Sequence, residues 1–165
     1  MYKDPVIQTV IDLLDGTGPS KLRGRYVNGD VLQPNKTELP LCYITRDTTT
    51  VTAETNMQDL HQASLVATVI LDWTQDLDQA YDMVAGTPEL YEMCEGRNDN
   101  FTLREDTMLY CLRKDQQLNG GLWLGVDSPV EVSYGIGVDR RGPGSFSIEA
   151  VIRFTAKMYV PNIAE

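Results

Sequence analysis

The stretch SFSIEAVIRFTAKMYV, residues 145–160, is the feature that most constrains the fold. Its even positions, from Phe146 to Val160, are all apolar, whereas most of its odd positions are polar or charged. Because side chains along a β-strand point alternately to opposite faces, this pattern predicts a single strand with one apolar face. At roughly 3.3 Å per residue the strand would approach about 50 Å, whereas strands usually have about 5–6 residues. We therefore expect part of its apolar face to cover the chain's own core and the remainder to meet a neighbour.

The net charge of −10 argues against a surface that binds nucleic acid by neutralising its phosphates. It is compatible with a surface past which nucleic acid slides, because like charges repel. The 165 residues suit one domain, and the 42% hydrophobic and 23% charged content is near the globular average. We find neither a run of 18 apolar residues nor a signal peptide in the sequence, and therefore predict no membrane span.

The residues that commonly carry catalysis give no pattern in this sequence. His61 is the only histidine, so a Ser-His-Asp or Cys-His arrangement would depend on it alone, and a surface or edge histidine is the simpler interpretation. The cysteines, Cys42, Cys94 and Cys111, are odd in number and lack CxxC spacing, which favours buried free thiols in a reducing compartment. The sequence contains no phosphate-binding glycine motif, and we predict no cofactor, no metal and no enzymatic activity.

The rest of the chain alternates between helical and strand patterns. A helix is expected to begin at Asp4-Pro5 and to end at Gly16, and Asn28-Gly29 is a hairpin signal within an irregular excursion over 16–38. Two strands are expected at 39–54, which could extend into an arm, and at 61–73, whose apolar centre suits mid-sheet. Further helices are expected at 74–94, broken at Gly86-Thr87-Pro88, and within 103–118, where a strand through TMLYCLRKD is the alternative. Glycine-punctuated β structure is expected at 120–139.

This order predicts an α+β fold. We expect a single domain over residues 1–165, with a mostly antiparallel sheet, a long C-terminal strand, and two or three helices packed on one face. Residues 16–38 and 137–145 are expected to be extended loops.

Acidic residues dominate between positions 55 and 100, where Arg97 is the only basic residue. A solvated helix face explains such a run most simply, but Asp76, Asp78 and Asp82 could also present negative potential to a charged partner or a channel. We find neither calcium-loop spacing nor a selected carboxylate pair there. Lys21, Arg23 and Arg25 form a matching basic segment, and in a ring of identical subunits the two could meet head to tail.

The order of these segments resembles the tail terminator and related neck, or head–tail completion, proteins of long-tailed bacteriophages. The resemblance is carried by the leading helix DPVIQTVIDLLDG, the segment ELPLCYITRDTTTVTAE, the strand SLVATVILDW with its following helix TQDLDQAYDMV, and the closing strand SFSIEAVIRFTAKMYV. It implies a small structural protein of the virion that forms a hexameric ring, caps the tail tube and joins it to the head. Its implied partners are its own copies, the tail tube protein and head–tail connector proteins. DNA would pass through the ring without specific binding, and the protein would lie in the virion neck after assembly in the host cytoplasm.

Other functions stay open at this point. The chain could be another head–tail connector or tail subunit, an adaptor module that captures a partner at a sheet edge, or an enzyme with an acidic cleft. The expected contact residues are Lys21, Arg23, Arg25, Arg153 and Lys157 toward neighbouring subunits, with Met57 to Leu60 and the segment 140–144, including Arg140 and Arg141, toward the tube or connector. Plain surface loops are the alternative interpretation of these segments.

Overall fold

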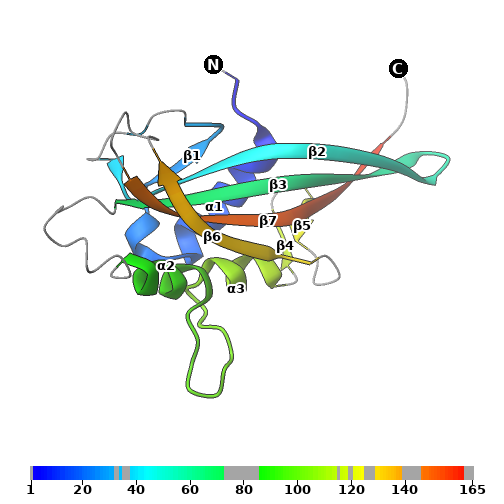
Figure 1. Ribbon diagram of the computed structural model, residues 1–165. Coiled ribbons are helices and arrows are strands. Elements are labelled where there is room, and N and C mark those ends of the chain that lie inside the picture. Colours follow the sequence, from blue (N-terminus) through cyan, green and yellow to red (C-terminus); the bar gives the residue numbers. More distant parts are fainter. Residues whose placement is uncertain are drawn as a thin grey trace, which may run out of the picture.

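The computed structural model describes residues 2–31, 34, 38–72, 86–114, 116–118, 121–124, 129–138 and 146–161. They form an α+β domain, as the sequence predicts, with a seven-stranded sheet in the order β1-β2-β3-β7-β5-β4 and with β6 also paired to β7 (Figure 1). The elements are α1 (Pro5–Thr17), a 3-10 helix (Ser20–Leu22), β1 (Tyr26–Asn28), β2 (Leu41–Thr55), β3 (Gln58–Asp72), α2 (Gly86–Glu95), α3 (Met108–Arg113), β4 (Gln116–Gln117), β5 (Trp123–Leu124), β6 (Glu131–Val138) and β7 (Phe146–Pro161).

Three long strands form the middle of the sheet. The central strand, β3, pairs antiparallel with β2 on one side and with β7 on the other, which confirms the mid-sheet position that its apolar centre predicts. The expected C-terminal strand is also confirmed, because β7 has 16 residues. The even positions of β7 from 148 to 156 are buried, and they join residues of all three helices in one hydrophobic cluster on one face of the sheet. Two odd positions, Ser147 and Glu149, are buried as well.

Helix α1 begins as its sequence predicts but ends two residues later. The Asp4 carboxylate accepts hydrogen bonds from the backbone N–H groups of Val6 and Ile7, and Pro5 is the first helical residue. The expected end at Gly16 is wrong: Gly16 lies inside the helix, and Gly18 is the C-cap. A Cβ atom at Gly18 would lie 2.6 Å from the Leu14 carbonyl oxygen, whereas one at Gly16 would meet nothing within 4 Å. The chain therefore needs a glycine at position 18.

The described part of the excursion over 16–38 is more regular than expected, and Asn28-Gly29 forms no hairpin within it. It includes the end of α1, the 3-10 helix and β1, which pairs parallel with β2 from Tyr26↔Cys42 to Asn28↔Ile44. The Asn28 side-chain amide donates to the Asp4 carbonyl at 2.8 Å, and the Gly29 N–H donates to the Ile44 carbonyl at 3.0 Å. Asn28 thus ties β1 to the start of α1, and the pairing partner of β1 is a strand further along the chain.

The helical predictions for 74–94 and 103–118 are each confirmed in part, by α2 (Gly86–Glu95) and α3 (Met108–Arg113). Helix α2 begins at Gly86, within the expected break, and the preceding residues 73–85 lie outside the described part of the chain. In the described part of TMLYCLRKD the helix α3 forms, so the alternative strand is wrong there, whereas Gln116 and Gln117, within the expected helical range, form β4. The Thr107 hydroxyl caps α3 by accepting from the Tyr110 N–H at 3.3 Å. The last part of the expected loop over 137–145 also lies outside the described residues, and Gly137 and Val138 belong to β6.

The central strands continue well beyond the helices, as Figure 1 shows at the right. We call residues 50–62 and 157–161 the arm: it comprises the far end of β2, the β2–β3 turn, the start of β3 and the end of β7. No arm residue is buried, although the β2–β3 and β3–β7 pairing continues to Thr55↔Gln58 and Gln58↔Pro161. The extended arm suggested by the sequence of 39–54 is therefore present.

Candidate assembly surface

The outer edge of β2 is the longest unpaired strand edge among the described residues. Strand β1 pairs only with residues 42–44, so residues 45–55 of β2 have a described partner strand, β3, on one side alone. Every second residue of an edge strand points its N–H and C=O groups outward, where another strand can pair with them. Near the arm tip, residues 158–161 of β7 have β3 as their only described partner strand.

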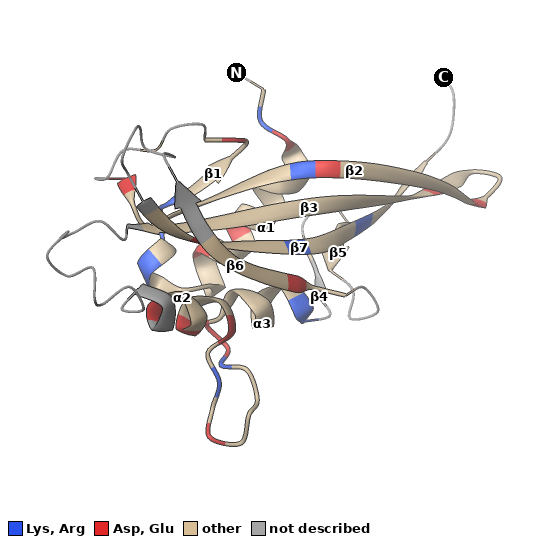
Figure 2. Ribbon diagram, viewed as in Figure 1, with Lys and Arg blue, Asp and Glu red and all other residues tan. Residues whose placement is uncertain are grey.

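The composition of this edge favours pairing in its middle and discourages it at its ends. Asp47 and Glu54 flank the uncharged stretch TTTVTA, residues 48–53, which is rich in β-branched residues. The pairing register also shifts between Arg46 and Thr48 and between Ala53 and Thr55. Bulges and charges are the devices with which edge strands limit pairing. Figure 2 shows the corresponding length of β2 without charged residues.

Both sides of the arm carry apolar side chains that are open to solvent. On the side that continues the core face, Val51, His61 and Met158 are cross-strand neighbours, and Val51 is 54% exposed. On the other side, Leu60 pairs with Tyr159, whose ring centroid lies 5.0 Å from that of Trp123. Met57 lies in the tip turn and is 64% exposed. Three of the large exposed hydrophobic residues, Val51, Met57 and Tyr159, therefore belong to the arm, and burial of such side chains favours association.

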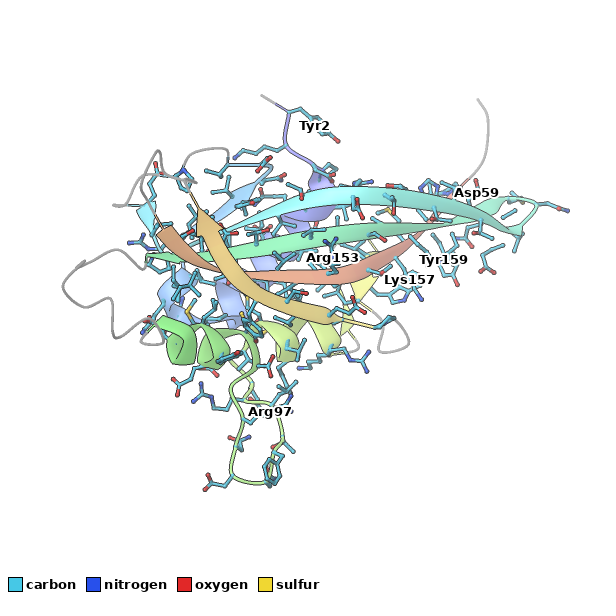
Figure 3. All side chains as sticks on the ribbon, viewed as in Figure 1. Tyr2, Asp59, Arg97, Arg153, Lys157 and Tyr159 are labelled. Atoms are coloured by element: carbon cyan, nitrogen blue, oxygen red, sulfur yellow. The ribbon has the colours of Figure 1, made fainter. Side chains whose placement is uncertain are left out.

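The predicted contact residues of β7 lie on the face of the sheet opposite the main core. Arg153 is exposed, and its cross-strand neighbours are Glu131 of β6 and Val66 of β3. Lys157 is half-buried at the base of the arm beside Trp123, and Figure 3 shows it near Tyr159. Arg153 and Asp47 both line a cavity of about 250 Å³. Arg153 and Lys157 thus belong to one face of one strand, as the alternation predicts.

The predicted basic segment lies elsewhere, beside α2. The Lys21 ammonium forms an ion pair of 2.5 Å with Glu89, a member of the acidic run, within the same chain. Arg25 donates to the Glu38 carbonyl oxygen at 3.1 Å, and the Arg23 side chain is exposed. One contact between the basic and acidic segments is therefore intramolecular.

Several predicted residues need correction or cannot be placed. Met57 to Leu60 is not a loop before a strand: Met57 lies in the tip turn, and Gln58 to Leu60 already belong to β3. Asp76, Asp78, Asp82, Arg140 and Arg141 lie outside the described residues.

The described part of the chain shows no cluster of metal ligands and no activated thiol. No group of three or more potential metal-binding side chains occurs there. The three cysteines are free and buried, as predicted, and burial raises the pKa of Cys94 to about 12. Burial also raises the pKa of Cys42 and of Cys111, so these thiols stay protonated and unreactive near neutral pH. His61 lies half-buried within the arm.

A projecting loop between α2 and α3 is a feature that the sequence reasoning missed. We call residues 96–104 the Phe101 loop, which extends away from the sheet below α2 and α3 (Figure 1), with Arg97 at its neck (Figure 3). Phe101 is 80% exposed and has a φ of 70°, a left-handed conformation that costs on the order of 1–3 kcal/mol for a residue other than glycine. The turn-forming sequence Asn98-Asp99-Asn100 was the available signal.

Hydrogen bonds define the shape of this loop. The Phe101 N–H donates to the Asn98 carbonyl at 2.9 Å, and the Asn98 N–H donates to the Thr102 carbonyl at 2.8 Å. The Arg97 guanidinium donates to the Phe101 carbonyl at 3.1 Å, and the Asn100 side chain accepts from the Thr102 hydroxyl at 2.6 Å. The exposed ring is therefore presented by an ordered turn.

Comparison with known proteins does not assign the chain to a family. No protein-family model matches the sequence, and no curated protein matches it. No helix in the described part of the chain is both long and apolar enough to cross a bilayer. The molecule is thus characterised by its class, an α+β domain whose central strands continue into an exposed arm.

Proposed function

We propose that the chain is a structural ring subunit of the tail terminator type, which caps a phage tail tube and joins it to the head. The observation that carries the proposal is the arm, in which paired strands continue past the core and present an unpaired, uncharged edge. When a neighbouring subunit covers such an edge, other strands can no longer pair with it. If one surface of each subunit binds a different surface of the next, the subunits form a closed ring whenever their successive rotations add up to a full turn.

The partners proposed here follow from the same role. Copies of the chain cover the arm, the tail tube protein and head–tail connector proteins bind the two ends of the ring, and DNA passes through the lumen. The net charge of −10 supports passage without adhesion. We place Asp76, Asp78 and Asp82 toward the lumen. Reversing these three charges should increase retention of DNA by the ring, and unchanged passage and binding would contradict this placement.

The test of the ring is the mass of the purified protein in solution, with negative-stain images of the same sample. Light scattering should give a multiple of the 18.5 kDa chain, and the images should show closed rings. A lysine in the uncharged edge, Val51→Lys, should dissociate the ring by placing a charge where a strand must pair. Val51→Thr is the matched control, because it keeps the β-branched shape without a charge, and it should still assemble. A wild-type protein that stays monomeric alone and with tail tubes would contradict the proposal.

The same edge favours one alternative, an adaptor module that binds an extended peptide as an additional strand of the sheet. The supporting observation is the uncharged stretch 48–53. Its backbone groups are open to pairing, and no charged side chain in the stretch would repel a peptide. An adaptor would remain monomeric, and Val51→Lys would then abolish peptide binding without a change in mass.

A further inference from the structure

The sheet has a second open edge, at strand β6. Residues 131–138 of β6 pair with β7 on one side, and no described strand pairs with them on the other. The open part of β2 lies on the other side of the β3–β7 pair, as Figure 1 shows, so one subunit presents two different strand edges. A closed ring requires a contact between two different surfaces of this kind.

The composition of the β6 edge suits strand pairing. Residues 132–138, VSYGIGV, carry no charge, as is true of residues 48–53 in β2. A Cβ atom at Gly135 would meet nothing within 4 Å, and the φ of Gly135 is not positive. No contact in the described part of the chain therefore requires a glycine there. Glycine within a strand weakens it and often marks the close approach of another backbone.

The directions of the strands suit a contact between the two edges. Strands β2 and β7 both run antiparallel to β3, and β6 runs antiparallel to β7, so β6 and β2 have opposite directions. When a sheet continues from one copy to the next with the same face toward the helices, each strand keeps its direction. Strand β6 of one subunit then meets β2 of the next in antiparallel orientation, the slightly more stable kind of pair.

The two edges also match in length. Strand β6 pairs with residues 146–153 of β7, and on the same side of β7 strand β5 pairs with residues 156–157 and has β4 outside it. A neighbouring β2 strand along β6 therefore has to turn before it reaches β4. When Thr52 lies opposite Gly135, residues 49–56 run along the whole of β6, and the tip turn falls where β6 begins.

This register places apolar side chains on the same face. Tyr134 packs against the core on the helix side of the sheet, and the centroid of its ring lies 4.3 Å from that of Tyr91, which is 44% exposed. Ala53 would lie opposite Tyr134, on the side of the arm that also carries Val51. The two tyrosines of one subunit would thus adjoin the apolar side of the next subunit's arm, and burial of these side chains favours association.

Charges at one end of the contact also select this register. Glu54 lies opposite the uncharged Ser133, and Glu131 has Arg153 of its own subunit as a cross-strand neighbour. A slip of two residues toward β4 would set Glu54 opposite Glu131, and like charges directly opposite each other are destabilising. A slip of one residue would turn the apolar sides of the two strands to opposite faces.

We propose that the β6 edge of one subunit pairs antiparallel with the β2 edge of the next, with Thr52 opposite Gly135. The inference rests on the proposed ring and names the surface that covers the arm edge. Because Thr52 lies beside Leu60 in its own subunit and Gly135 is level with Ile70, the arm of one subunit then lies along the body of the next.

Single cysteines test the contact directly. Thr52→Cys and Gly135→Cys alter exposed positions, and the three native cysteines are buried. A short bis-maleimide should link the two variants when they are mixed before assembly, and should link neither variant to itself. Self-linking of Thr52→Cys would show that two β2 edges meet about a two-fold axis, which would overturn the proposal.

Absence of the mixed product in a sample whose mass remains that of a ring would overturn the pairing while the proposed function stands. A wild-type protein that is monomeric under all conditions would overturn both.

Two lysine variants test whether the contact joins different edges. Gly135→Lys should dissociate the ring as Val51→Lys does, whereas Gly135→Ala, which adds no charge, should still assemble. Each lysine variant keeps one intact edge, so a mixture of the two should form a pair of twice the 18.5 kDa chain mass, although each alone is monomeric. Assembly of Gly135→Lys as in the wild type would overturn the proposal. A mixture that stays monomeric at every concentration, from variants that unfold cooperatively, would overturn it as well.

Discussion

The two ends of strand β3 lie in the same sheet and have opposite environments. In the body, Leu65, Ala67, Val69 and Leu71 are at most 5% exposed against the helices, whereas no residue of 58–62 in the arm is buried. The ladder to β7 runs without a break through both halves, from Asp72↔Ser147 to Gln58↔Pro161. Backbone pairing alone contributes little net stability, so the body is held by burial and the arm by its attachment to the body. We infer that the arm is built for contacts outside the subunit.

The same substitution at two positions of β3 should have very different effects. Leu65→Ala removes a fully buried side chain and should lower the free energy of unfolding by about 2–5 kcal/mol. Leu60→Ala, five residues away in the arm, should lower it by less than about 1 kcal/mol in the monomer, because Leu60 is only partly covered. Urea unfolding measures both. Equal losses would show that the arm has a core of its own.

Alkaline pH should weaken the body first. Burial raises the pKa of Cys94 from 9.0 to about 12, and burial also raises the pKa of Cys42, Tyr26 and Tyr134. Because the folded state then holds protons that the unfolded chain releases, this stability is fully present below about pH 9 and is lost as pH rises toward 12. A group whose pKa is higher by one in the folded state than in the unfolded chain contributes about 1.4 kcal/mol of this stability.

Thermal unfolding at a series of pH values, with titration of the thiols, measures this loss. The melting temperature should fall steadily above pH 9 while the three cysteines become reactive. A melting temperature that is constant to pH 11 would contradict the burial of these groups.

The link between α1 and strand β2 should contribute less. Arg46 donates from Nε to Asp4 Oδ2 at 2.9 Å and from Nη2 to Asp4 Oδ1 at 2.8 Å, and the same carboxylate caps α1. Asp4→Ala removes the cap and the ion pair and should cost about 1–2 kcal/mol of unfolding free energy. Asp4→Asn keeps a capping oxygen and should cost less; equal costs would show that the ion pair, not the cap, matters.

The smallest effect should come from the ion pair between Lys21 and Glu89. Both side chains are substantially exposed, at 59% and 42%, so solvent screens the pair and Lys21→Ala should change stability by less than about 0.5 kcal/mol. A double-mutant cycle with Glu89→Gln measures the coupling. A coupling above about 1 kcal/mol would show that the basic segment and α2 act as one unit.

The long central strands could be predicted from the sequence because the alternation of apolar and polar side chains is enough to identify a strand with one buried face. Even positions such as Ile152 and Phe154 face the core, and the uncharged, threonine-rich stretch of β2 indicated an arm. The Asn28-Gly29 signal failed because a long-range parallel pairing and the bonds of Asn28 to Asp4 override a local turn preference.

The features that could not be predicted depend on contacts in the folded chain that a local sequence pattern does not reveal. Gly18, rather than Gly16, ends α1 because of a backbone contact with Leu14. The Lys21–Glu89 pair joins residues that are 68 positions apart. Phe101 was missed because its exposure and left-handed conformation depend on the turn that surrounds it.

Hydrogen exchange of the backbone amides tests most directly whether copies of this chain cover the arm. The measurement compares the assembled protein with the monomeric Val51→Lys variant, residue by residue. We predict slower exchange in the assembly for the outward-facing amides of residues 45–55, with little change in 65–71, whose amides are already within the body. Equally fast exchange of residues 45–55 in both samples would contradict the account.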